Sequence, residues 1–121
     1  MQAFVFDTYA LFEIIGGNSN YSKYLECEII INDFIFAELC YKFIREGNIK
    51  KADFYGAEFA RFRKELDADT IKKAMLFRAQ NKKRNLSATD CISYMMAAKL
   101  NLKFLTGDRQ FENMSNVEFV K

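Results

Sequence analysis

The chain has 121 residues, is 50% hydrophobic and 28% charged, and carries a formal net charge of only +2, which is ordinary for a single globular domain spanning residues 1–121. Histidine is absent, so acid–base chemistry near neutral pH has to use carboxylates, Lys, Tyr, Cys or metal-bound water. No run approaches the roughly 18 apolar residues of a membrane span, and no basic segment precedes the first apolar run, so we expect a cytoplasmic protein with no membrane association.

The first predicted strand is the apolar run Ala3–Phe6, which is short enough to be a buried strand. Asp7 and Thr8 follow it and predict the start of a helix that ends near Gly16. Asp7 is therefore expected at the junction between a strand and a helix.

The same pattern repeats further along the chain. Ile29–Ile31 predict a second strand, and Asn32 or Asp33 is expected to cap a helix that continues to about Glu46. Glu38 lies inside this helix, on a surface that is otherwise apolar.

Two helices are expected in the middle of the chain. From about Lys50 to Leu66, apolar residues recur at steps of three to five, which predicts one amphipathic helix. A further helix is expected from Asp67 to about Gln80. The first helix has an unusually aromatic face, which we expect to lie partly in a protein–protein interface, with core packing as the alternative. The residues of this face are Phe54, Tyr55, Phe59 and Phe62.

The remaining chain predicts one buried helix and two strands. Leu86–Asn101 is too uniformly apolar for a surface helix, Leu102–Thr106 predicts a strand, a helical turn follows Asp108, and Val117–Val120 predicts a last strand. Strands that alternate with helices imply a mostly parallel sheet covered on both faces, which is a three-layer α/β fold.

Four carboxylates occupy positions where an acidic side chain is either energetically costly to bury or serves a function: Asp7, Glu38, Asp90 and Asp108. Two of them directly follow predicted strands, so they are expected at the crevice beside the carboxyl ends of the sheet. One cause would explain all four, namely a divalent hard cation, because Mg²⁺ and Mn²⁺ prefer oxygen ligands. Such a site suits phosphodiester hydrolysis by metal-bound water.

Each carboxylate also has a simpler interpretation on its own. The two acids that follow strands could cap the turns after them. Glu38 could pair with Lys42 one helical turn away. Asp90 has the spacing of a capping box with Ser87.

Charge is distributed unevenly along the chain. Residues 1–39 hold six acids and one base, whereas residues 70–89 hold six bases and no acid. A basic excess outside a metal site favours a polyanionic substrate, and Lys82, Lys83 and Arg84 are candidates for contacts with RNA phosphates. The alternative is a solvated basic surface.

Four short motifs also carry a resemblance. "FVFDTYAL", "AEL" around Glu38, "LSATD" and "FLTGDRQF" resemble, in order, the acidic motifs of PIN-domain ribonucleases, and the length resembles the VapC-type toxins of that family. The resemblance implies a PIN-like fold and a metal-dependent endoribonuclease in which Asp7, Glu38, Asp90 and Asp108 are catalytic and bind one or two Mg²⁺ or Mn²⁺ ions. It also implies auxiliary hydroxyl groups at Thr8 and Thr106, an antitoxin partner and a homodimer.

Two alternatives to a toxin remain at this point. The chain could be an RNA-processing nuclease, or a PIN-like module that binds RNA or protein with little catalysis. Toxins of this kind often have another Asp two residues after the strand-end Asp, where this chain has Gln110. An amide is a weaker ligand than a carboxylate, so the number of metal ions stays open between one and two.

Overall fold

A four-stranded parallel sheet forms the centre of the protein. The computed structural model describes residues 1–121, and the strands follow the spatial order β2-β1-β3-β4, with every neighbouring pair parallel. Their bounds are β1 Ala3–Phe6, β2 Glu28–Ile30, β3 Lys103–Thr106 and β4 Val117–Phe119. The expected parallel sheet is confirmed, and all four carboxyl ends lie at the same edge.

Five α-helices surround the sheet, and four 3₁₀ turns lie in the connections between elements. The α-helices are α1 Thr8–Ile15, α2 Asp33–Arg45, α3 Ile49–Phe59, α4 Ala68–Gln80 and α5 Ala88–Lys99. The 3₁₀ turns are η1 Ser19–Glu26, η2 Ala60–Phe62, η3 Lys82–Arg84 and η4 Arg109–Phe111.

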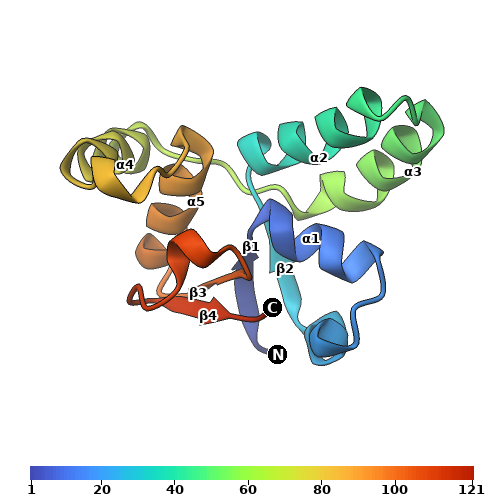
Figure 1. The fold of residues 1–121 in the computed structure, drawn as a ribbon, viewed down its shortest axis with the longest axis horizontal. Coiled ribbons are helices and arrows are strands. Elements are labelled where there is room, and N and C mark those ends of the chain that lie inside the picture. Colours follow the sequence, from blue (N-terminus) through green and yellow to red (C-terminus); the bar gives the residue numbers. More distant parts are fainter.

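Helices cover both faces of the sheet and extend beyond its carboxyl edge. The connection from β1 to β2 and the connection from β2 to β3 run in opposite directions across the sheet. Right-handed crossovers therefore place α1 and α5 on opposite faces of the sheet. Figure 1 shows the α2–α3 pair on one side of this edge and the α4–α5 pair on the other. The edge that carries the predicted acids is therefore flanked by two helical pairs.

The hydrophobic core lies between the sheet and these helices. It includes all three residues Phe4–Phe6 of β1, together with Cys91 and Ala97 of α5, which confirms that α5 is a buried helix. Asn32 is also fully buried, where it accepts a hydrogen bond from the Ile35 backbone at 2.9 Å. Asn32 is thus the cap that begins α2.

The helix expected from Lys50 to Leu66 is shorter in the structure, where α3 ends at Phe59. The apolar spacing continues beyond that point, but the backbone there pairs with the residue that follows β2. The Ile31 amide donates to the Phe62 carbonyl at 3.0 Å, and the Lys64 amide donates to the Ile31 carbonyl at 2.8 Å. This pairing draws residues after 62 into an extended path, so the prediction of one continuous helix was wrong.

The aromatic face of α3 is mostly used inside the protein. Phe59 is buried, and Tyr55 stacks on Phe43 of α2 with ring centroids 5.4 Å apart. Phe54 is the exception, because 60% of its surface is exposed. Core packing therefore accounts for most of this face, and a partner interface centred on Phe54 stays a prediction.

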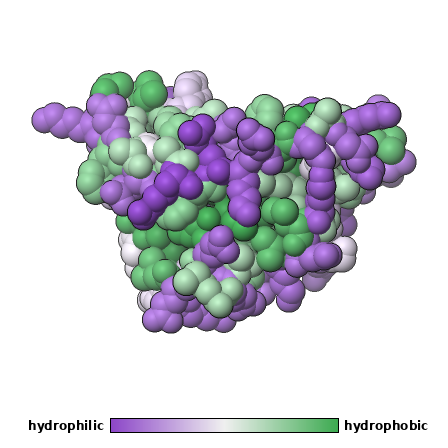
Figure 2. All heavy atoms as spheres, turned by 180° about the vertical axis from the view of Figure 1, so that it is seen from behind, coloured by the Kyte–Doolittle hydropathy of each residue, from purple (hydrophilic) through white to green (hydrophobic).

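The surface seen from behind the view of Figure 1 has an apolar centre framed by hydrophilic side chains (Figure 2). The hydrophilic chains are most prominent at the two upper corners, where the helical pairs lie. None of the helices combines the length and hydropathy that a membrane crossing requires.

Candidate functional site

Asp7 lies at the carboxyl end of β1 and is only 5% exposed. Its Oδ1 accepts a hydrogen bond from the Thr8 backbone amide at 2.8 Å, which caps α1. Its Oδ2 accepts one from the Thr106 hydroxyl at 2.6 Å, because Thr106 ends the neighbouring strand β3. Both oxygens of this buried carboxyl group are therefore held by the protein.

The environment of Asp7 disfavours its negative charge. Burial raises the pKa of Asp7 from 3.8 to about 7, the Thr106 hydrogen bond opposes this rise, and the charges of Asp90 and Asp108 add to it. These three carboxylates therefore interact electrostatically although they lie far apart in the sequence. A cation placed among them would favour the ionised form of Asp7.

Thr106 also connects Asp7 to the turn that carries Asp108. The Thr106 Oγ1 accepts a hydrogen bond from the Asp108 amide at 3.0 Å while it donates to Asp7. Asp108 in turn accepts from the Gln110 amide at 3.0 Å and caps η4. One hydroxyl group thus fixes the relative positions of two of the predicted site residues.

Asp90 lies in the first turn of α5, as its sequence position predicts. Its Oδ2 accepts from the Ser87 amide at 2.9 Å, and its own amide donates to the Ser87 hydroxyl at 3.0 Å. The capping box considered as the simpler interpretation is confirmed. Burial raises the pKa of Asp90, and the charge of Asp108 raises it further, against the hydrogen bonds from Ser87.

Glu38 joins this region through Thr8 and not through a cation on its own helix. Its Oε1 accepts a hydrogen bond from the Thr8 hydroxyl at 2.7 Å, which links α2 to the first residue of α1. The alternative pairing with Lys42 does not form, and the Lys42 Nζ instead lies 4.0 Å from the centroid of the Phe12 ring. The partnership between Glu38 and Thr8 depends on how α1 packs against α2, which the sequence alone did not reveal.

The donor atoms in this region match a hard divalent cation in type. Each of Glu38, Asp90 and Asp108 uses one carboxylate oxygen in a hydrogen bond and leaves the other without a partner in the protein. Oxygen donors of this kind suit Mg²⁺ or Mn²⁺. No three of the Asp, Glu and Cys side chains approach closely enough in the structure to enclose a metal ion. A metal site formed by all four acids therefore stays a prediction.

The basic run Lys82–Arg84 forms the exposed turn η3 between α4 and α5. The Arg84 guanidinium donates to the Gln110 carbonyl at 3.4 Å, so the run approaches the turn that follows Asp108. None of its three cations forms an ion pair. The structure thus brings free positive charge near one side of the candidate site, and its contact with RNA stays a prediction.

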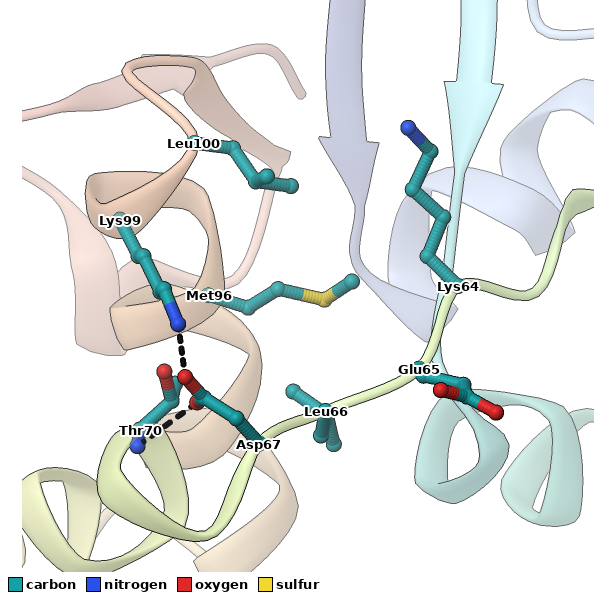
Figure 3. Close-up of a pocket in the computed structure, with 8 residues that line it drawn as sticks. All are labelled: Lys64, Glu65, Leu66, Asp67, Thr70, Met96, Lys99 and Leu100. Atoms are coloured by element: carbon teal, nitrogen blue, oxygen red, sulfur yellow. Dashed lines mark hydrogen bonds and ion pairs between the residues drawn. The ribbon is translucent and has the colours of Figure 1, made fainter.

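A separate pocket lies at the far end of α5 from Asp90 (Figure 3). There the Lys99 ammonium forms an ion pair with Asp67, which also accepts a hydrogen bond from the Thr70 amide. None of the four predicted acids lines this pocket. Two of its four charged side chains, Lys99 and Asp67, neutralise each other, so it is a weaker candidate for chemistry.

Comparison with known proteins supports the fold. No curated protein sequence matches the chain. A toxin–antitoxin complex from Klebsiella pneumoniae is similar, with 17% identity, coverage of 95% of each chain and a TM-score of 0.72. VapBC2 from Rickettsia felis, solved with a DNA fragment from its promoter, has 16% identity, coverage of 99% of this chain and 100% of that one, and a TM-score of 0.74.

VapBC-1 from nontypeable Haemophilus influenzae has 11% identity to this chain, with coverage of 98% of this chain and 96% of that one and a TM-score of 0.73. These identities are low, so the likeness concerns the α/β fold. The sequence itself matches the family model of the PIN domain over residues 4–117. That match includes every predicted acid and both threonines, and the chain belongs to the PIN domain family.

Proposed function

We propose that residues 1–121 form a single-domain, metal-dependent endoribonuclease that hydrolyses RNA phosphodiester bonds with Mg²⁺ or Mn²⁺. The observation that carries the proposal is the buried Asp7 at the carboxyl edge of the sheet. Asp90 and Asp108 add to the energetic cost of its negative charge, and a bound cation would offset that cost. PIN domains are typically metal-dependent nucleases, which supports the same conclusion.

The roles of the chain's own residues follow from their contacts. A divalent cation bound here would lower the pKa of a water molecule and stabilise charge on the phosphoryl oxygens. Asp7 and Asp90 would be its direct ligands, and Asp108 would complete the site. Thr106 holds the Asp7 carboxylate in place, and Thr8 holds one oxygen of Glu38. The free Oε2 of Glu38 can then bind the cation or accept a proton from the attacking water.

The test is cleavage of end-labelled single-stranded RNA in Mg²⁺, in Mn²⁺ and in chelator. We expect cleavage only with a metal ion, and its loss in Asp7→Asn, which keeps the cap of α1 but removes the charge. Asp53→Asn is the matched control, because Asp53 is an exposed carboxylate on α3 without an ion-pair partner. Equal cleavage by wild type and Asp7→Asn would overturn the proposed site.

We further propose that the nuclease is the toxin of a toxin–antitoxin pair and forms a homodimer. Toxin–antitoxin complexes among the structural neighbours support this assignment, and the exposed ring of Phe54 is a candidate contact. The alternative is an RNA-processing nuclease with no antitoxin. Induced expression should arrest growth, and coexpression of the adjacent gene should relieve the arrest and yield a copurifying complex. Normal growth without that gene product would favour the alternative.

A further inference from the structure

A groove between α1 and α2 begins where Thr8 meets Glu38. It has a volume of about 350 Å³, and residues of these two helices alone line it. The hydrogen bond between the Thr8 hydroxyl and Glu38 belongs both to the groove and to the candidate site. Whatever occupies the groove therefore lies beside Glu38 and Thr8 of the candidate site.

Cations on aromatic rings dominate the chemistry of this groove. The Arg45 guanidinium lies 5.6 Å from the centroid of Tyr41, and the Lys42 ammonium likewise covers the Phe12 ring. Neither cation forms an ion pair with a carboxylate. Glu38 is the only acid in the lining, so the groove has a positive charge that the protein itself does not neutralise.

Tyr41 gives the groove an exposed aromatic surface. Its side chain is 61% exposed although the residue lines the groove. A ring in this position can stack with an unpaired base, and cations beside it can contact the neighbouring phosphates. Bases in a duplex already stack on one another, so this combination favours a single strand.

We propose that the α1–α2 groove binds single-stranded RNA, with Tyr41 stacked on a base and Lys42 and Arg45 on the adjoining phosphates. The inference rests on the proposed RNA-cleaving function and specifies how its substrate is held. The basic turn η3 lies with the α4–α5 pair, on the other side of the candidate site from α2 (Figure 1). An RNA strand that contacts both the groove and η3 would have to cross the carboxylates.

The stacking contact can be tested by fluorescence anisotropy with a labelled single-stranded RNA of about 12 nucleotides in chelator, where cleavage does not occur. Tyr41→Ala should weaken binding about 5- to 150-fold, which corresponds to loss of one stacked base, whereas Tyr41→Phe should retain it. Wild type should bind the complementary duplex less tightly than the single strand. Leu25→Ala is the control, since it removes an exposed apolar side chain from η1, outside the groove.

The phosphate contacts can be tested through the salt dependence of the same binding. The double variant Lys42→Gln with Arg45→Gln should reduce the slope of log affinity against log salt by about 0.7 for each lost contact. Lys50→Gln removes an unpaired exposed cation from α3 and should leave the slope unchanged. Circular dichroism of every variant establishes that the fold is retained.

Several outcomes would overturn the groove assignment. These are RNA affinity that is equal in wild type and Tyr41→Ala, the absence of RNA binding by wild type, and a Tyr41→Ala effect confined to self-association or to antitoxin binding. The last outcome would make the groove a protein-docking surface. Cleavage by wild type in Mn²⁺ is measured separately. Cleavage without the variant effects contradicts only the groove, and the variant effects without cleavage contradict only the nuclease.

Discussion

Asp7→Asn should stabilise the metal-free protein more at pH 8 than at pH 5. The buried Asp7 carboxyl has a pKa of about 7 in the folded protein, compared with an ordinary value of 3.8. The folded state therefore binds a proton that the unfolded state has already released. Stability from this group is fully present below about pH 4 and is lost as the pH rises through about 7.

The size of the effect follows from the same pKa difference. At about 1.4 kcal/mol per pKa unit, the raised pKa of Asp7 costs the fold about 4 kcal/mol at pH 8, where the carboxyl is ionised, and about 1.5 kcal/mol at pH 5, where folding must take up a proton. Asn has no charge to bury, and its Oδ1 can still accept the hydrogen bond from the Thr8 amide. The Thr106 hydroxyl loses its carboxylate acceptor, which lowers stability at both pH values alike. The stability gain from Asp7→Asn should therefore be about 2–3 kcal/mol larger at pH 8 than at pH 5.

Chemical denaturation in chelator at the two pH values measures this difference for wild type, Asp7→Asn and the control Asp53→Asn. The control should follow wild type, because Asp53 is exposed on α3. A constant offset between Asp7→Asn and wild type would refute the reasoning, since it would mean that folding does not disfavour the charge of Asp7. A variant that is more stable but inactive is the combination expected of a functional carboxylate.

Four further predictions concern the metal ion, the basic turn and two glycines. Mn²⁺ at about 100 times its dissociation constant should stabilise wild type by about 2.7 kcal/mol, as measured by thermal melting. Asp90→Asn should reduce this gain, and an equal metal-dependent shift in the two proteins would contradict a shared ion. Alanine at all three positions of Lys82–Arg84 should weaken RNA binding for every sequence. It should also lower the slope of log affinity against log salt by roughly 0.7 per lost contact, and an unchanged slope would mean that the turn is solvated surface without RNA contacts. Gly107→Ala should destabilise the protein, because a Cβ there would overlap the ring of Tyr9. Gly56→Ala should stabilise it by up to about 1 kcal/mol in denaturation experiments, because a Cβ there has only ordinary contacts.

The sequence was most informative where one local rule decides the structure. Apolar runs that end in a polar residue located the four strands, and their parallel orientation followed from their alternation with helices. Side chains with capping ability located the starts of helices, as with Asn32 before α2 and Ser87 before α5. These features depend on neighbouring residues, so they could be predicted without knowledge of the fold.

Features that depend on contacts between distant segments were missed or misplaced. The turn η1 was not predicted, although Tyr21 and Tyr24 have the three-residue spacing at which side chains align in a 3₁₀ helix. The end of α3 was placed too late, because the pairing of Ile31 with residues 62–64 is a tertiary contact. Glu38 was recognised as unusual, but its partner Thr8 lies on another helix.

The predicted site depends both on local sequence and on contacts between distant segments, so it could be predicted only in part. Asp7 and Asp108 follow β1 and β3, and the sequence predicted that both would lie at the carboxyl edge of one sheet. It did not predict that β1 and β3 are neighbours, which is the reason that Thr106 can contact both Asp7 and the turn of Asp108. The residue types could thus be chosen from the sequence, whereas the hydrogen bonds that orient them required the structure.

Capping and metal binding were weighed as alternatives for these acids, but the structure makes them compatible. Asp90 and Asp108 each use one oxygen as a cap and keep the other free, so a cap can hold a carboxylate in place for a cation. Asn retains an oxygen that can cap, and it loses the negative charge that attracts an ion. Asp90→Asn should therefore leave the metal-free stability nearly unchanged or slightly higher while it weakens metal binding. Ser87→Ala should instead lower the metal-free stability by about 1 kcal/mol, while it keeps every carboxylate that could bind the metal ion. Loss of metal-dependent stabilisation in both variants would mean that the cap is required to orient the ligand, whereas loss in Asp90→Asn alone would mean that the charge is sufficient.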